Sequence, residues 1–229
     1  MKRIAVLTGA GVSADSGLST FRDAGGLWEG HDVMEVASPE GWRANRELVL
    51  KFYNERRSQL KTANPNSAHY AIAKLEEKYE VTVITQNVDD LHERAGSSNI
   101  IHLHGELVKA RSSVDEYLLY EIGYKDICIG DKCEKGSQLR PHVVWFGEMV
   151  PMIETAAEVV SEADILIVVG TSLLVYPAAG LLDFAPQGIP IYIVDPVKPD
   201  LYSFPGNIEF IIDKAAKGMP ELADKLLEK

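Results

Sequence analysis

Cysteine, basic charge and long apolar runs are all scarce in this chain of 229 residues. Its two cysteines cannot form the framework of several disulfides that holds many small secreted domains together. No run of about 18 apolar residues occurs, so we predict no transmembrane helix and no membrane partner. The N-terminus leads directly into a strand-like apolar segment, without the features of a signal peptide. These absences predict a cytoplasmic protein.

Basic residues number 23 against 34 acidic ones, so the net charge is −11. A general nucleic-acid-binding protein would carry a basic face, and we therefore do not expect nucleic acid as a partner. The acidic balance would allow a basic peptide to bind, although a solvated acidic surface is the simpler interpretation. With 46% hydrophobic residues, the chain can bury the core of one large domain, or of one domain with a smaller insertion.

Apolar segments typical of buried strands alternate with helical stretches along the chain. The expected strands are residues 4–7, 81–85, 100–103, 164–169, 189–194 and 208–212, and the expected helices include 46–62, 68–78 and 220–227. This alternation predicts an α/β fold with a parallel sheet. Polar residues follow the C-terminal ends of five strands: Gly9-Ala10-Gly11, Gln86-Asn87, His104, Gly170-Thr171-Ser172 and Asp195. Ligands of open α/β sheets bind at that edge, which makes it the predicted site.

The glycine loop after the first strand is a candidate dinucleotide-binding turn. Gly9 and Gly11 fit the pattern G-x-G-x-x-G, and Ala14 takes the third position as a permitted small residue. If residues 12–17 open a helix, its free N–H groups form an anion site suited to a pyrophosphate. The alternative is a plain strand-turn-helix without a ligand. The following residues 20–23 place an aromatic, a cation and a carboxylate where an enzyme could enclose the nicotinamide end of a cofactor.

Five ordered motifs cover nearly the whole chain: GAGVSADSGLSTFRD, TQNVDDLHERAG, HLHGEL, LRPHVVWFGE and GTSL. Together they resemble the sirtuin family of NAD-dependent protein lysine deacylases. The resemblance implies a Rossmann-like parallel sheet with helices on both faces, plus a smaller inserted domain with a helical module and a degenerate zinc-ribbon-like module. The cleft between the two would hold NAD and an acyl-lysine peptide. The Rossmann-like part is expected at residues 1–23, 81–105 and 150–229, and the inserted part at 24–80 and 106–149.

The resemblance implies that His104 and Asn87 are catalytic. The acyl oxygen would attack the nicotinamide ribose, nicotinamide would leave, and His104 would act as general base on the ribose. The products would be free lysine, nicotinamide and O-acyl-ADP-ribose. A neutral imidazole suits this role, although a lone histidine is more often structural. Asn87 would orient the ribose or a water molecule.

The resemblance also implies a set of residues that bind the cofactor. Asp89 would hold the nicotinamide amide. The alternative for both Asn87 and Asp89 is that they cap the helix that starts at residues 89–90. Asp195 is a weaker assignment, because the family more often has Asn near this place. The full expected set is Gly9, Ala10, Gly11, Ser13, Ala14, Phe21, Arg22, Trp28, Gln86, Asn87, Asp89, Gly170, Thr171, Ser172, Asp195 and Ala215.

The expected peptide site lies in residues 143–148, where the resemblance implies strand addition by the substrate; the alternative is an ordinary core strand. Its expected contacts are Val144, Phe146, Gly147 and Glu148.

Tyr53 and Arg56 are three residues apart, hence on one face of a predicted helix. A guanidinium and a phenol suit an acyl group that ends in a carboxylate, such as succinyl or malonyl. Within the resemblance, the pair matches the class III branch with desuccinylase and demalonylase activity, and Ala37 would make room for the longer chain. The alternative is a solvated helix in which Arg56 pairs with a surface acid.

The chain departs from many sirtuins in its cysteines. A closed zinc site needs four ligands, and only Cys128 and Cys133 are present, so we do not expect zinc. The insertion would then be held by its own core, for which the candidates are Tyr117, Leu118, Tyr120, Ile122, Tyr124 and Ile127. The sequence gives no indication of the oligomeric state.

Three other functions compete with deacylation. A dehydrogenase would need an acidic residue at the end of a second strand about 20 residues past the glycine loop, and no strand leads into the acids of residues 28–40. A non-catalytic module that binds NAD or ADP-ribose would not need both His104 and Asn87. An ADP-ribosyltransferase would consume NAD without an acyl-lysine, and would have no use for Tyr53 and Arg56.

Overall fold

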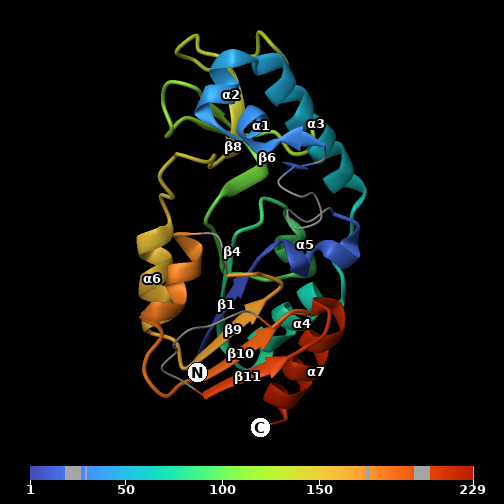
Figure 1. Cartoon of the computed structure of the whole chain (residues 1–229), viewed down its shortest axis with the longest axis vertical. Helices are drawn as coiled ribbons and strands as arrows, with labels where there is room; N and C mark the ends of the chain where they lie inside the picture. Colours follow the sequence, from blue (N-terminus) through green and yellow to red (C-terminus); the bar gives the residue numbers. More distant parts are fainter. Residues whose placement is uncertain (19–26, 29, 174–175, 199–206, 229) are drawn as a thin grey trace.

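The structure is a computed structural model that describes residues 1–18, 27–28, 30–173, 176–198 and 207–228. Figure 1 shows two parts, a large sheet with flanking helices at one end and a smaller assembly of helices and strands at the other. No helix among these residues is both long and apolar enough to cross a membrane.

The large sheet has six parallel strands in the order β11-β10-β9-β1-β4-β5. Its strands are β1 (Arg3–Thr8), β4 (Glu80–Thr85), β5 (Ile100–His102), β9 (Ile165–Val169), β10 (Pro190–Val194) and β11 (Asn207–Ile211). The chain first builds outward from β1 to β5, and then returns to the other side of β1 with β9. The crevice between β1 and β9 is therefore the point where the strand order reverses, and ligands of such sheets bind there. The predicted α/β class with a parallel sheet is confirmed.

Helices cover both faces of the sheet, which explains why its central strands are apolar throughout. Alternate residues of β1 face opposite layers: Ile4 and Val6 contact one core, while Ala5 and Leu7 contact the other. The first layer contains α4 (Ser67–Lys74) and α7 (Ala215–Leu227), and the second contains α6 (Ile153–Ser161) and the 3-10 helix Ala178–Phe184. Figure 1 shows α6 on one side of the sheet and α4 with α7 on the other.

The smaller part is built around an antiparallel sheet of order β7-β6-β8. Its elements are β2 (Leu27–Trp28), β3 (His31–Asp32), α1 (Val33–Val36), α2 (Pro39–Ala44), α3 (Arg46–Thr62), β6 (Gly105–Ser112), β7 (Leu119–Glu121) and β8 (Leu139–Val143). Phe52 and Leu60 of α3 share a core with Leu107 and Ile127. Of the core predicted for the insertion, Ile127 is buried but Tyr117 is 86% exposed, because it lies in the turn before β7. The prediction for Tyr117 was wrong.

Helix starts follow the expected capping chemistry. Ser38 followed by Pro39 is a sequence pattern that predicts a helix start. In the structure the Ser38 hydroxyl accepts from Gly41 N at 3.0 Å, with Pro39 in the first helical position of α2. The closing helix α7 begins at Ala215, five residues before the predicted start at Pro220. Proline cannot donate to the carbonyl of Ala216 four residues earlier, but the Ser67 hydroxyl donates to that oxygen instead. The lost helical bond is thereby replaced, which allows Pro220 inside the helix.

The α-helix expected at residues 12–17 is absent, and two 3-10 turns, Ala10–Val12 and Ala14–Ser16, take its place. The amide of Asn66 donates to Val12 O at 2.8 Å, which is the carbonyl that a continuing α-helix would use. Gly17 then ends the segment in the left-handed region, with φ of 83°. Tertiary contacts thus shorten the segment to isolated turns.

The helix α4 lies within the range 24–80 that the sequence analysis assigned to the inserted part. Its buried residues Ala68 and Ile72 instead belong to the core under the large sheet, together with Met219 of α7. The reason is that α4 leads directly through the 3-10 turn Leu75–Glu77 into β4, so its apolar face must cover the sheet that this strand joins.

Candidate active site

One cavity of about 520 Å³ lies at the carboxyl edge of the large sheet and extends to the smaller part. On the sheet side it is lined by Gly9, Ala10, Gly11, Ser13, Ala14, Gln86, Asn87, Asp89, His104, Gly170, Thr171, Ser172, Asp195 and Ala215. On the other side it is lined by Ala37, Tyr53, Arg56, Val144, Phe146, Gly147 and Glu148. Phe21, Arg22 and the side chain of Trp28 lie outside the described residues. The fold thus brings together the remaining predicted site residues.

The floor of the cavity is the contact between the loops after β1 and β9. Gly11 N donates to Gly170 O at 2.8 Å, and a Cβ on Gly11 would meet Gly170 Cα at the same distance. Gly170 has φ of 63°, and its own Cβ would meet Val12 N at 2.3 Å. Only glycine allows the two backbones to approach this closely. The N–H groups of Val12 and Ser13 close the 3-10 turns, so these two are not the free donors that the expected helix would have supplied, and the anion site stays a prediction.

Ser13 is the centre of a buried network on the glycine loop. Its hydroxyl donates to Asp89 Oδ2 at 3.0 Å and accepts from Asn87 Nδ2 at 3.1 Å. The other oxygen of Asp89 accepts from Leu91 N, the first N–H group of α5 (Leu91–Ala95). The N-cap of this helix is Asp90, whose side chain makes no capping bond, so Asp89 holds the helix start from the preceding position. Burial raises the pKa of Asp89 to about 6, although these two hydrogen bonds oppose the rise.

His104 follows β5 and points into the cavity beside the loop after β4. Its Nδ1 lies 2.9 Å from the carbonyl oxygen of Gln86. A carbonyl can only accept, so Nδ1 carries the proton and Nε2 keeps its lone pair. Burial lowers the pKa of His104 below its ordinary value, while the bond to Gln86 opposes the shift. The imidazole is therefore neutral at pH 7 and can accept a proton at Nε2.

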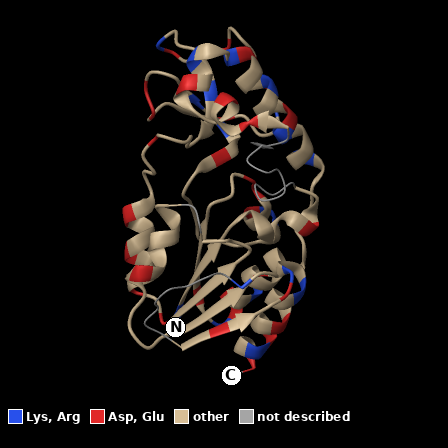
Figure 2. Cartoon of the chain, in the orientation of Figure 1, with Lys and Arg blue, Asp and Glu red and all other residues tan. Residues whose placement is uncertain are grey.

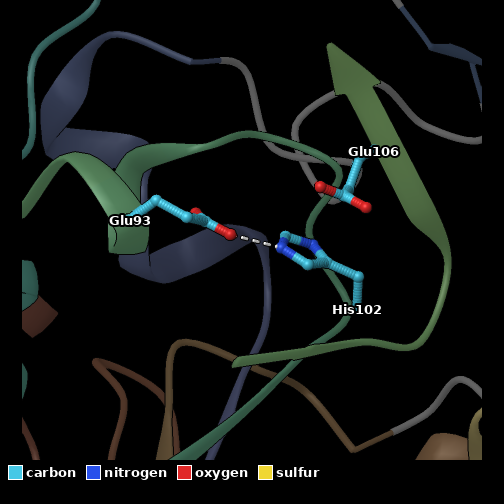
Figure 3. Close-up of side chains that lie close together, drawn as sticks. All are labelled: Glu93, His102 and Glu106. Atoms are coloured by element: carbon cyan, nitrogen blue, oxygen red, sulfur yellow. Dashed lines mark hydrogen bonds and ion pairs between the residues drawn. The ribbon is translucent and has the colours of Figure 1, made fainter. Parts of the chain in front are cut away.

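A second histidine, His102, holds the next carbonyl of the same loop. Its Nδ1 lies 3.4 Å from Asn87 O, and its Nε2 lies 2.6 Å from Glu93 Oε1, as Figure 3 shows for the latter. Both partners only accept, so the protonated form of this ring can donate from both nitrogens. Burial alone would lower the pKa of His102, but the hydrogen bond and charge of Glu93 raise it overall. The two histidines thus contact successive carbonyls of the same loop, and their pKa values are shifted in opposite directions.

Glu93, His102 and Glu106 form the group of potential metal ligands found in the described part of the chain (Figure 3). Glu106 is already paired with Lys109 Nζ at 2.8 Å. Cys128 is exposed, while the Cys133 thiol is buried and donates to Ser112 Oγ at 3.3 Å. Within the described ranges neither cysteine belongs to a metal-binding group.

The far end of the cavity is closed by Tyr53, Arg56 and residues 144–148. Tyr53 is fully buried, and its hydroxyl accepts from the indole N–H of Trp145 at 3.0 Å. Arg56 is 8% exposed, and its guanidinium carbon lies 5.9 Å from the Phe52 ring centroid. The segment 144–148 lies beyond β8, and Phe146 N bonds to Ala37 O at 3.0 Å. Arg56 is therefore not the solvated helix residue of the alternative interpretation.

Glu148 lines the cavity, but its carboxylate is already engaged. Arg140 donates to both of its oxygens at 2.6 and 3.1 Å, and Arg111 donates at 3.1 and 3.2 Å. Trp145 N adds a fifth contact at 2.8 Å. The structure thus gives the Glu148 carboxylate the role of fixing this wall, and the peptide contact expected at residue 148 stays a prediction.

Sequence reasoning missed the residues that support the site from behind. His69 Nε2 lies 3.4 Å from Ser13 Oγ, and the His69 ring contacts His92, whose Nε2 lies 3.1 Å from Thr8 Oγ1. Trp145 was also missed as a partner of Tyr53. These residues come from segments far apart in the chain, and no local pattern marks them.

The charged residues on the sheet side of the cavity, among them Asp89 and Asp195, lie in the loops that follow the strands. Figure 2 shows acidic residues along α6 and mixed charges along α3 and α7. The strands β9 and β10, whose ends form the floor, carry no charged residue.

Comparisons with known proteins agree with this geometry. The profile of the Sir2 family matches residues 9–177. A protein of Helicobacter pylori named NAD-dependent protein deacylase is 54% identical over 228 residues, which cover 100% of this chain and 99% of the relative. A Bacteroides thetaiotaomicron protein of the same name is 52% identical, with 99% of each chain covered.

Solved structures show the same likeness. The crystal structure of a Sir2 homologue in complex with NAD superposes with a TM-score of 0.89 at 42% identity, covering 99% of this chain and 90% of that one. A Sir2 homologue with the substitution S24A, in complex with ADP-ribose, gives a TM-score of 0.90, also at 42% identity, covering 99% and 92% of the two chains. The resemblance found in the sequence motifs is confirmed, and the chain belongs to the Sir2 family.

Proposed function

We propose that the chain is an NAD-dependent protein deacylase that removes acyl groups from lysines of protein substrates and releases nicotinamide and O-acyl-ADP-ribose. The observation that carries this proposal is the single cavity that joins the glycine loop, His104 and the Tyr53–Arg56 wall. The full-length relatives named NAD-dependent protein deacylase support it.

The residues at the sheet edge fit NAD in their donor chemistry. Ser13, Thr171 and Ser172 present hydroxyls, and Gln86 and Asn87 present amides, which suit phosphate and ribose oxygens. Gln86 Nε2 is held by Thr171 Oγ1 at 3.2 Å, so the two loops present these groups together. NAD would supply an activated ribose as acceptor for the acyl oxygen.

His104 is the group that moves a proton. Its neutral form, with the proton on Nδ1 and the lone pair on Nε2, can take a proton from a ribose hydroxyl. Gln86 O fixes this tautomer. Asn87 would orient the ribose or a water molecule, and Asp89 would hold a carboxamide through the carboxyl that Ser13 and Leu91 position.

The acyl end of the cavity favours a group that ends in a carboxylate, such as succinyl or malonyl, with acetyl as a poorer substrate. Arg56 supplies a buried positive charge and Tyr53 a phenol on the same helix face. The carboxylate of Glu148 does not oppose this charge, because Arg140 and Arg111 neutralise it. Ala37 leaves space for a longer acyl chain.

The test uses two matched peptides, one with succinyl-lysine and one with acetyl-lysine, each with and without NAD, followed by mass spectrometry. We expect succinyl removal only with NAD, and faster than acetyl removal. Arg56→Met should lower kcat/KM on the succinyl peptide far more than on the acetyl peptide, because the charge-assisted bond is lost. Arg43→Met is the matched control, since Arg43 lies on the surface with its side chain 69% exposed.

Each outcome separates one part of the proposal. Equal losses on both peptides for Arg56→Met would contradict the acyl assignment. Faster acetyl removal by the wild type would keep the deacylase and overturn the preference for acidic acyl groups. NAD consumption without any acyl-lysine would indicate the ADP-ribosyltransferase, and binding of NAD without turnover would indicate the non-catalytic module.

A further inference from the structure

A series of contacts between side chains lies behind the acyl end of the cavity, and it runs from Glu148 through Arg140 and Trp145 to Tyr53. Trp145 is 2% exposed and Tyr53 is 0% exposed, so both groups interact with protein rather than with bulk water. Of these four residues, only Tyr53 is assigned a direct contact with the acyl group in the proposed function.

The Trp145–Tyr53 bond determines how the phenol can meet a ligand. An indole N–H only donates, so in their bond at 3.0 Å the Tyr53 oxygen must be the acceptor. The O–H bond of Tyr53 therefore points in another direction. A carboxylate only accepts, and it can use Tyr53 solely through that O–H group. The geometry of one indole nitrogen thus fixes the phenol in the donor role.

Trp145 itself is held on several sides. The guanidinium carbon of Arg140 lies 3.2 Å from the Trp145 ring centroid, and the ring of Trp42 lies 5.8 Å away on a tilted plane. The backbone N–H of Trp145 donates to Glu148 at 2.8 Å, and Glu148 in turn holds Arg140. The indole therefore cannot turn to another partner without breaking this arrangement.

We propose that Trp145 is a positioning residue for acyl specificity, because its indole N–H holds the Tyr53 hydroxyl as the donor that meets an acidic acyl group. This inference rests on the proposed preference for succinyl or malonyl groups. It means that the preference for succinyl over acetyl peptides depends on the hydrogen bond between Trp145 and Tyr53, as well as on Tyr53 and Arg56 themselves. Burial raises the pKa of Tyr53, against the opposing effect of the Trp145 bond, so the phenol keeps its proton at neutral pH.

The experiment compares Trp145→Phe, Tyr53→Phe and the double variant. Phenylalanine at position 145 keeps an aromatic ring and removes the N–H donor. We expect the ratio of kcat/KM for succinyl over acetyl peptide to fall about fivefold in each single variant, the size of one lost hydrogen bond. The loss should lie mainly in KM for the succinyl peptide. The double variant should lose no more than Tyr53→Phe alone, because both changes remove the same interaction.

Trp42→Phe is the matched control. It replaces the neighbouring buried indole, which contacts Trp145 at 5.8 Å between ring centroids, and leaves the Tyr53 hydroxyl bond intact. This control should keep the wild-type ratio. Equilibrium binding of a fluorescent succinyl-lysine peptide, measured by polarisation without NAD, should weaken for Trp145→Phe and not for Trp42→Phe.

If Trp145→Phe proves unstable, β-(3-benzothienyl)alanine at position 145 keeps the bicyclic shape and lacks the N–H group, and the same loss of ratio is expected. If Tyr53→Phe lowers the ratio of kcat/KM for succinyl over acetyl peptide but the Trp145 variants leave it unchanged, this inference is overturned and the proposed acyl preference stands. Additive losses in the double variant would overturn it as well. A wild type that does not discriminate between the peptides would overturn both.

Discussion

Replacement of Glu148 by Gln should destabilise the protein strongly, although the two side chains have the same shape. The carboxylate accepts from Arg140 and Arg111, whose side chains are only 8% and 11% exposed. It also accepts from Trp145 N at 2.8 Å. Gln keeps one acceptor oxygen but removes the negative charge, and it brings an NH₂ group toward a guanidinium. Two nearly buried cations then face each other without this counter-charge.

The expected magnitude follows from the burial of these groups. Breaking a buried ion pair by removing one partner costs about 3–5 kcal/mol. Glu148 is 19% exposed and Gln retains part of the hydrogen bonding, so we expect a loss of about 2–4 kcal/mol in the free energy of unfolding. The exposed pair of Arg3 and Glu162, with side chains 48% and 64% exposed, gives the matched control Glu162→Gln. That change should cost less than about 1 kcal/mol.

The loss should depend on pH. Burial alone would raise the pKa of Glu148, but hydrogen bonds and charge from Arg140 lower it below the ordinary value of 4.5. A carboxyl whose pKa is lower in the folded state stabilises that state above its unfolded pKa, and loses this contribution as the pH falls through its folded pKa. The difference between wild type and Glu148→Gln should therefore be full at pH 7 and shrink below pH 4.5.

The assay is urea unfolding followed by circular dichroism at pH 7 and at pH 4, with the slope m compared between variants. A difference below about 1 kcal/mol at pH 7 with unchanged m would refute the reasoning, because it would mean that the ion pair contributes no more than a surface pair. A difference that grows as the pH falls would refute the assigned sign of the pKa shift.

Three further predictions concern the cofactor side of the cavity. Gly11→Ala places a Cβ 2.8 Å from Gly170 Cα, so we expect a loss of about 1–3 kcal/mol in unfolding free energy and weaker NAD binding by calorimetry. Unchanged binding would contradict the argument that the backbones of Gly11 and Gly170 must approach closely. Because the pKa of His104 lies below 6.5, activity should fall only when the pH drops below that value, and a fall that begins above pH 6.5 would speak against a neutral base. His104→Gln should lower kcat about 10²–10⁴-fold. Asp89→Asn should stabilise the protein at pH 7.5 by about 1–2 kcal/mol in urea unfolding while lowering activity, because burial raises the pKa of the Asp89 carboxyl from 3.8 to about 6. The cost of this carboxyl grows as the pH rises from the unfolded pKa to the folded pKa and is complete above it, so the gain should vanish near pH 4, and a gain that persists there would contradict the shift.

The sequence by itself determined the sheet and the edge at which the predicted site residues meet. Apolar segments such as Ile165–Val169 can only be buried on both faces, which requires a parallel sheet covered by helices on each side. The polar residues that follow these strands then had to meet at one edge, as Asn87 and Thr171 do. Local chemistry was equally readable where partners are close in the chain, as in the Ser38 cap.

Tertiary structure decided what depends on partners distant in the chain. Asn66 takes the carbonyl of Val12 and shortens the predicted helix to turns, and Ser67 makes Pro220 acceptable inside α7. The proton on His104 is placed by Gln86, 18 residues away, and the donor role of Tyr53 by Trp145, 92 residues away. A motif specifies which groups are present, but hydrogen bonds across the fold decide which atom of each group donates, which accepts, and which carries charge.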